Sequence, residues 1–153
     1  MRLVVYGTLR QGEHLSWILS WASSQHLGKF ETIELPGLRI HVVGDCPGAK
    51  IGSKGNKAIV ELWEFNLPKA KELSFLEMLD QIEGVRDGLY ERSYINTPRG
   101  KALVYTICEN VEKYPQIRDW KEWQKKSYRE RMRILMKAGG ARVAIYTRAS
   151  IYT

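Results

Sequence analysis

Cysteine and long hydrophobic runs are both scarce in this sequence of 153 residues. The two cysteines, Cys46 and Cys108, are too few for a disulfide scaffold in a chain of this length, and we expect both to be reduced. No stretch approaches the roughly 20 apolar residues of a membrane-spanning helix, and the first residues lack a signal-peptide pattern. These absences predict a cytoplasmic protein, and the length fits a single domain.

Metal-binding and phosphate-binding patterns are missing as well. The three histidines are scattered without metal-ligand spacing, so we expect no metal site. Gly7 and Gly12 have the glycine spacing of a phosphate-binding loop, but Glu13 and His14 stand where that motif needs lysine followed by serine or threonine. Neither cysteine lies in a motif typical of a catalytic nucleophile.

Positive charge is plentiful but concentrated in one segment. The net charge is +7, and residues 118–137 hold eight basic and three acidic side chains, a net +5. On a helix, basic side chains would fall mostly opposite apolar ones: Lys125, Lys126, Arg129, Arg133 and Lys137 against Trp120, Trp123, Tyr128, Met132 and Leu135. We favour an ordinary solvated amphipathic helix. The alternative is an anion-binding surface for nucleic acid or acidic partners.

Apolar periodicity and turn residues predict a mixture of strands and helices. Strands are expected at residues 2–6, 25–35, 38–43, 57–65, 90–97, 101–107 and 142–147, with a loop at 45–56. Three helices are expected. One covers residues 14–22, and another covers about 117–137. The helix between them begins after Asn66 as N-cap, has Pro68 in its first turn and ends at Gly84. The order lacks the regular alternation of a doubly wound sheet. It predicts an α+β domain with a mostly antiparallel sheet or small barrel and flanking helices.

Glu83 is a candidate for chemistry because it falls at the predicted C-terminal end of a helix, between Ile82 and Gly84. The partial negative charge of a helix C-terminus and apolar neighbours both raise the pKa of a carboxyl group. A glutamate with a raised pKa can accept and return a proton near neutral pH, as a general acid/base must. A solvated end-of-helix residue is the alternative, and from these residues alone we favour it.

The first predicted strand ends at Gly7 and Thr8. Glycine accepts turn geometries that other residues refuse, so the consecutive backbone amides here could point at one anion. Such a loop could hold a carboxylate or a developing oxyanion. A plain β-turn is the alternative.

Four segments taken together resemble the γ-glutamylcyclotransferase-like superfamily over about residues 2–110: VVYGTLRQGEH, DCPGA, LDQIEGV followed by LYERSYI, and ALVYTI. The family's Tyr-Gly-Ser/Thr-Leu-Arg loop is matched by Tyr6, Gly7, Thr8, Leu9 and Arg10. Its acidic catalytic position, in an Asp-x-x-Glu-Gly segment, is matched by residues 80–84, which gives Glu83 that role. The Tyr-x-Arg that follows is matched by Tyr90 and Arg92.

The resemblance implies an enzyme that cyclises a γ-glutamyl amine or γ-glutamyl amino acid to 5-oxoproline and releases the free amine. The substrate's own α-amine attacks its γ-carbonyl, so the enzyme mainly folds the substrate and moves protons. Glu83 would move the protons, and the amides of Gly7, Thr8 and Leu9 would hold the α-carboxylate or the tetrahedral oxyanion. No cofactor is implied. A non-catalytic member of the same fold that binds a small ligand is the alternative.

The resemblance also implies that several further side chains contact the substrate or support the site. Arg10 could pair with a substrate carboxylate or form a structural salt bridge. Tyr6 is expected to pack at the strand end and line the pocket, and Tyr90 and Arg92 to brace it. Trp120 is the nearest match to an aromatic side chain that some family members place over the ligand, although packing within its helix is favoured.

Overall fold

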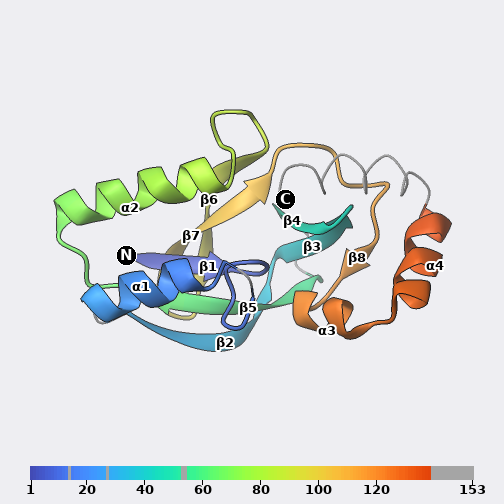
Figure 1. Ribbon diagram of the computed structural model, residues 1–153, viewed down its shortest axis with the longest axis horizontal. Coiled ribbons are helices and arrows are strands. Elements are labelled where there is room, and N and C mark those ends of the chain that lie inside the picture. Colours follow the sequence, from blue (N-terminus) through green and yellow to red (C-terminus); the bar gives the residue numbers. More distant parts are fainter. Residues whose placement is uncertain (14, 27, 53–54, 139–153) are drawn as a thin grey trace.

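The computed structural model describes residues 1–13, 15–26, 28–52 and 55–138 (Figure 1). The elements follow in the order β1 (Arg2–Val5), α1 (Trp17–His26), β2 (Lys29–Pro36), β3 (Leu38–Val43), β4 (Cys46–Ile51), β5 (Lys57–Glu64), α2 (Lys69–Ile82), β6 (Tyr90–Thr97), β7 (Gly100–Ile107), β8 (Gln116–Ile117), α3 (Trp120–Lys125) and α4 (Tyr128–Ala138). A five-stranded sheet has the order β2-β5-β1-β7-β6, and a three-stranded sheet has the order β4-β3-β8. Among these pairs only β1 and β7 run parallel in the described residues. The predicted α+β class with a mostly antiparallel sheet is confirmed.

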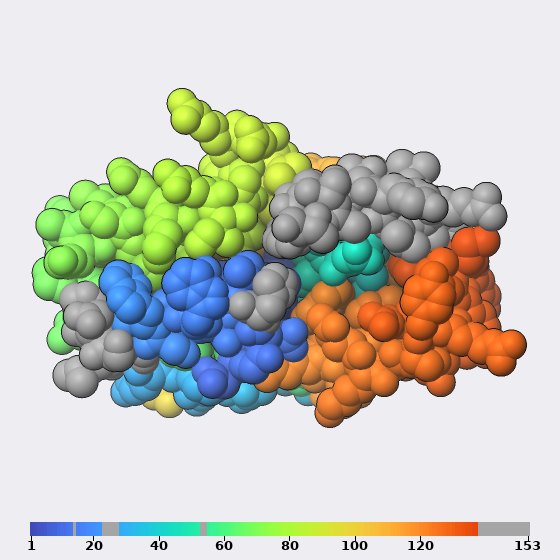
Figure 2. Space-filling model, viewed as in Figure 1, coloured from blue at the N-terminus to red at the C-terminus, as the bar shows by residue number. Residues whose placement is uncertain are grey.

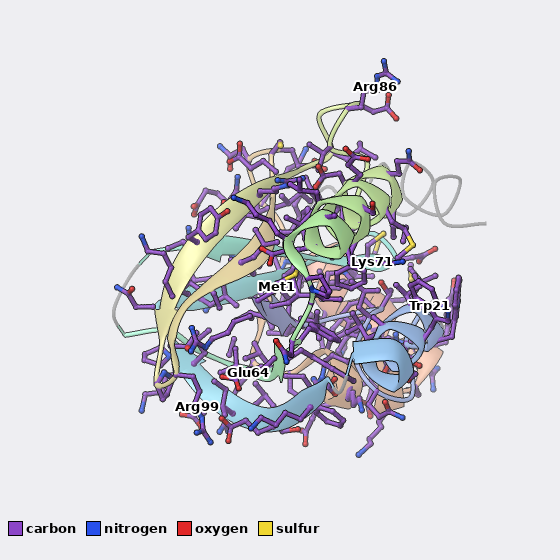
Figure 3. All side chains as sticks on the ribbon, turned by 90° about the vertical axis from the view of Figure 1, so that its left-hand side faces the viewer. Met1, Trp21, Glu64, Lys71, Arg86 and Arg99 are labelled. Carbon is purple, nitrogen blue, oxygen red and sulfur yellow. The ribbon has the colours of Figure 1, made fainter. Side chains whose placement is uncertain are left out.

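β1 lies in the middle of the five-stranded sheet and contributes to a hydrophobic cluster on each face. Side chains alternate along a strand, so Leu3 and Val5 belong to one cluster and Val4 to the other. The first cluster includes Leu19 of α1 and Leu79 of α2, both fully buried. Figure 3 shows these two helices on the same side of the curved sheet. Apolar packing on both faces therefore holds β1 in place, and with it the turn that follows the strand.

Residues 46–51 form β4, so the prediction of a loop over 45–56 is wrong for this part. The strand pairs with β3 from Val43↔Cys46 onward, across a two-residue turn in which Gly44 has φ 68°. Pro47 is tolerated because β4 is an edge strand of its sheet. Position 48 must be glycine because there is no room for a side chain: a Cβ there would come within 2.7 Å of Ile107 Cδ1.

Helix α2 begins one residue after Pro68, which occupies the N-cap position with an extended ψ of 147° and no side-chain cap. The predicted N-cap at Asn66 is therefore wrong. An N-cap at Asn66 would make Leu67 the first helical residue, and a residue that precedes proline is disfavoured in the helical region. The other end of the helix agrees with the prediction, because Gly84 follows it with φ 65°.

The predicted single helix over 117–137 is two helices, α3 and α4, separated by Lys126 and Ser127. Lys126 is extended, with ψ 148°, and the Glu130 amide donates to Ser127 Oγ at 3.1 Å. Ser-x-x-Glu at 127–130 is the sequence pattern of a capping box, so the sequence held the signal for a new helix start. The two helices lie at one end of the molecule (Figures 1 and 2).

Helix α1 is shifted along the chain from its predicted range of 14–22. The Leu15 amide donates to Thr8 O and the Ser16 amide to Glu13 O, which holds these residues in turns and delays the helix to Trp17. It then continues to His26, so the next strand starts at Lys29 rather than at residue 25. The predicted strand at 142–147 lies outside the described residues. Across the described part of the chain, no helix has the length and apolar character to cross a membrane.

Candidate functional site

The loop after β1 and the C-terminal end of α2 line one small cavity. Its walls are residues 4–9, Pro47 of β4, Glu83, Tyr90 of β6 and Tyr105 of β7. The volume is about 30 Å³, which is about the room of one water molecule. Segments that are far apart in the sequence thus bring one carboxyl group and one turn together.

Glu83 reaches this cavity because of the way α2 ends. The Gly84 amide donates to Gln81 O and the Val85 amide donates to Asp80 O, which is the hydrogen-bond pattern of a Schellman motif. Glu83 is the C-cap residue, with φ −82° and ψ −2°. No donor among the described residues contacts its carboxyl group, and burial raises the pKa of Glu83 to about 7. The group is therefore suited to exchange a proton near neutral pH.

The turn at residues 7–9 presents backbone donors that have no acceptor among the described residues. Its carbonyls are used within the chain, because the Arg10 amide donates to Gly7 O at 2.9 Å and the Leu15 amide to Thr8 O at 3.0 Å. Within the described residues, the amides of Gly7, Thr8 and Leu9 donate to no backbone or side-chain acceptor. Successive backbone amides of this kind can bind one anion together where they point into a cavity.

Two tyrosine hydroxyls hold the walls of the cavity together. Tyr6 Oη donates to Tyr105 O at 2.7 Å and accepts from the Ala49 amide at 3.3 Å. Tyr90 Oη donates to Pro47 O at 2.7 Å. Both side chains are buried, so these bonds join β1, β4, β6 and β7 around the site. This is the arrangement expected for Tyr6 and Tyr90 as lining and bracing residues.

Tyr105 is a lining residue that the sequence analysis did not single out. Its hydroxyl donates to Asp80 Oδ1 at 2.7 Å, and Arg92 donates to both oxygens of Asp80, at 2.8 and 2.6 Å. Hydrogen bonds from Arg92 lower the pKa of Asp80, whereas burial and the bond to Asp80 raise the pKa of Tyr105. Tyr105 and Pro47 both lie in segments, ALVYTI and DCPGA, that carried the family resemblance, but neither residue type has a distinctive spacing of its own.

Two predicted contacts, Arg10 and Trp120, are not among the residues that line the cavity. Arg10 is 3% exposed, and its Nη1 donates to Asp119 Oδ1 at 2.7 Å while its Nε lies 3.5 Å from Glu61 Oε2. Of the two alternatives for Arg10, the structural salt bridge is the one present. Trp120 is 2% exposed and packs in a separate cluster with Trp123 and Leu135, which is the helix packing that the sequence favoured.

Gly7→Ala is expected to lower the free energy of unfolding by about 1–3 kcal/mol, the usual effect of overpacking a filled site. A Cβ at Gly7 would come within 2.3 Å of Pro47 Cγ, so the turn or β4 has to move. Gly55→Ala is the matched control, because a Cβ there meets nothing within 4 Å. Thermal melts of the two variants and the parent measure the effect. Equal melting temperatures for both variants would contradict the close contact of Pro47 with Gly7.

Comparisons with known proteins agree with this fold. Residues 3–125 match the profile of the family described as gamma-glutamyl cyclotransferase, AIG2-like. The chain is similar to PH0828 from Pyrococcus horikoshii, with 27% identity, a TM-score of 0.61, and coverage of 81% of this chain and 92% of that one. Protein ytfP from Escherichia coli has 25% identity, a TM-score of 0.55, and coverage of 82% and 100%.

A mouse AIG2-like protein shares the fold, at 22% identity and a TM-score of 0.54, with coverage of 78% of this chain and 86% of that one. The chain has no significant match among curated proteins. The family profile nevertheless spans most of the chain, including every residue of the cavity wall. The protein therefore belongs to the gamma-glutamyl cyclotransferase, AIG2-like family.

Proposed function

We propose that the protein cyclises a γ-glutamyl amine or a γ-glutamyl amino acid to 5-oxoproline and releases the free amine. The observation that carries this proposal is the position of Glu83, which lines the same cavity as residues 7–9, whose amides have no acceptor among the described residues. Family membership supports the same class of reaction. No other carboxylate lines this cavity in the part of the chain that the structure describes, so the proton-transfer role falls to Glu83.

The reaction needs one group that first accepts and then donates a proton. The Glu83 carboxylate takes a proton from the substrate's α-ammonium group, and the freed amine attacks the γ-carbonyl carbon to close a five-membered ring. The attacking nitrogen, which now carries a positive charge, releases its second proton to solvent. The C–N bond to the leaving amine then breaks, and protonated Glu83 returns its proton to that nitrogen. No water is consumed, and Glu83 ends in the state in which it began.

The turn at residues 7–9 supplies the electrostatic part of the reaction. As the amine attacks, the γ-carbonyl oxygen gains negative charge, which the amides of Gly7, Thr8 and Leu9 stabilise by hydrogen bonds. Amides that are fixed in a turn need no reorganisation at that moment. The cavity volume is about 30 Å³, so the substituent of the leaving amine lies outside it.

The proposal is tested by incubating the purified protein with a panel of γ-glutamyl dipeptides and γ-glutamyl amines. We expect 5-oxoproline and free amine in equal amounts from at least one substrate, measured by mass spectrometry. The matched controls are the α-glutamyl dipeptides of the same composition, in which the amine is not bonded to the γ-carbonyl. Failure of every γ-glutamyl compound to yield 5-oxoproline would overturn the proposal.

The rate should depend on pH through Glu83. Only the carboxylate form can act as the base, and burial raises the pKa of Glu83 to about 7. We therefore expect kcat/KM to rise about tenfold per pH unit on the acid side and to level off above that pKa. A pH–rate profile with a γ-glutamyl substrate measures this. A profile that is level from acid pH through neutrality would contradict Glu83 as the base.

A further inference from the structure

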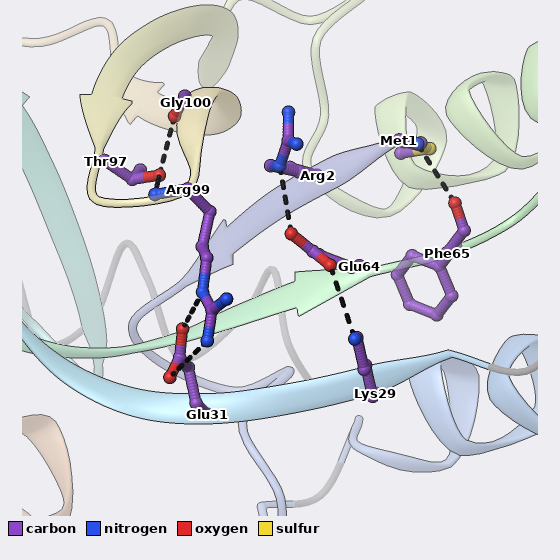
Figure 4. Close-up of polar contacts among 9 residues, drawn as sticks. All are labelled: Met1, Arg2, Lys29, Glu31, Glu64, Phe65, Thr97, Arg99 and Gly100. Atoms are coloured by element: carbon purple, nitrogen blue, oxygen red, sulfur yellow. Dashed lines mark hydrogen bonds and ion pairs between the residues drawn. The ribbon is translucent and has the colours of Figure 1, made fainter.

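Three arginines of α4, Arg129, Arg131 and Arg133, form no ion pair with any described residue, which distinguishes them from most arginines of the molecule. Elsewhere, most arginines form ion pairs, as Arg2 does with Glu64 and Arg99 with Glu31 (Figure 4). We call residues 125–137 the basic elbow. Its six cations form no ion pair with any described residue: Lys125, Lys126, Arg129, Arg131, Arg133 and Lys137.

The packing of the two helices turns these cations outward. Trp123 of α3 and Leu135 of α4 are buried against Val42 of β3, which fixes the inner face of the elbow. Five of the six cations are exposed, and Arg131 is partly buried. The break at residues 126–127 places the cations of α3 and α4 on two short helices around one bend. The bend therefore presents a positive surface to a partner.

The same bend contains a cavity of about 370 Å³ whose lining includes Trp120, Tyr128 and Arg131. Tyr128 is 72% exposed, so it does not belong to the apolar face on which the sequence pattern placed it. Trp120 Nε1 and Arg131 Nε are buried and have no acceptor in the described part of the chain. Buried donors normally have a partner. The cavity thus has an exposed aromatic ring in its wall, and two donors without acceptors lie buried in residues beside it.

We propose that the basic elbow binds single-stranded nucleic acid, with a base in the cavity against Tyr128 and the backbone phosphates on the surrounding cations. Single-strand binding surfaces combine a positively charged track with aromatic side chains on which bases stack. A duplex keeps its bases inside, so the cavity would take no part in binding it. Asp45 also lines the cavity, and its negative charge favours a base there over a phosphate.

The test uses a fluorescein-labelled thymidine oligonucleotide of about 12 nucleotides, within the range of known single-strand sites, and fluorescence anisotropy. The triple variant Lys126→Glu/Arg129→Glu/Arg133→Glu is compared with Lys69→Glu/Lys71→Glu/Arg86→Glu. All six side chains are exposed, and both triple variants change the net charge equally. We expect binding to be lost in the first variant and retained in the second. Circular dichroism melts establish that both variants are folded.

Three further measurements bear on the proposal. The logarithm of the binding constant should fall with the logarithm of salt concentration by about 0.7 per phosphate contacted. Tyr128→Ala should weaken binding about fivefold to 150-fold, the range for loss of one stacked base, whereas Tyr128→Phe should retain it. Equal losses in the two triple variants, no binding at low salt, or tighter binding of the matching duplex would each overturn the proposal.

Discussion

Glu83→Gln is expected to lower the rate of 5-oxoproline formation by at least about a hundredfold, the lower range for loss of a general acid/base. Glutamine has nearly the shape of glutamate but cannot exchange the proton that the ring closure requires. Since the side chain makes no hydrogen bond among the described residues, the substitution breaks no hydrogen bond there. The loss should therefore appear mainly in kcat, measured by steady-state assay with the best γ-glutamyl substrate.

The same variant should be more stable than the parent protein above neutral pH. Burial raises the pKa of Glu83 from its ordinary value of 4.5 to about 7. Between these two values the folded protein binds more protons than the unfolded chain, so stability falls as pH rises through this window. Glutamine removes this loss, which amounts to about 3 kcal/mol by linkage at 1.36 kcal/mol per pKa unit. The two proteins should become equally stable below the lower value.

Thr8→Ala is the matched control for Glu83→Gln, since Thr8 also lines the cavity but contributes its backbone amide to the proposed chemistry. It should change neither the rate nor the pH dependence of stability by much. Denaturant unfolding at acid and alkaline pH, together with the assay, measures all three proteins. A Glu83→Gln variant with full activity, or one destabilised equally at every pH, would refute the assignment of Glu83.

The parts of the site that the sequence predicts are those set by local rules. The apolar residues of β1 and the glycine after Glu83 are recognisable because strand alternation and helix termination act within a few residues. The sequence did not predict β4 because Pro47 and Gly48 ordinarily break strands. Pro47 is tolerated because β4 is an edge strand, and glycine is needed at position 48 because Ile107 leaves no room for a Cβ. Such reasons depend on neighbours that are distant along the chain.

Arg10 illustrates the same limit for charged residues. An arginine after a glycine turn is compatible with a ligand contact or with a salt bridge, and the residues around it do not distinguish them. Its partners, Glu61 and Asp119, come from β5 and from the start of α3. Asp119 also accepts from the Lys121 amide as the N-cap of α3. Only the tertiary fold reveals that Arg10 ties the turn at residues 7–9 to both elements.

Arg10→Met should therefore destabilise the fold by about 3–5 kcal/mol, as expected when one partner of a buried ion pair is removed. Glu61 is 1% exposed, so its carboxyl group would stay buried without the guanidinium group of Arg10 beside it. It would still accept from the Gln11 amide at 2.9 Å and from Trp63 Nε1 at 3.1 Å, with Lys121 Nζ at 3.8 Å. Denaturant unfolding at neutral pH measures the change.

Arg99→Met is the matched control, because Arg99 pairs with Glu31 at 2.9 Å on the surface, where both side chains are about half exposed. Exposed ion pairs contribute about 0–1 kcal/mol, so this variant should unfold almost as the parent does. The double variant Arg10→Met/Glu61→Gln should recover part of the loss, since the buried carboxylate is then removed as well. If Arg10→Met costs no more than Arg99→Met, the buried pair does not hold the turn, and the amides of residues 7–9 must be positioned by the surrounding backbone alone.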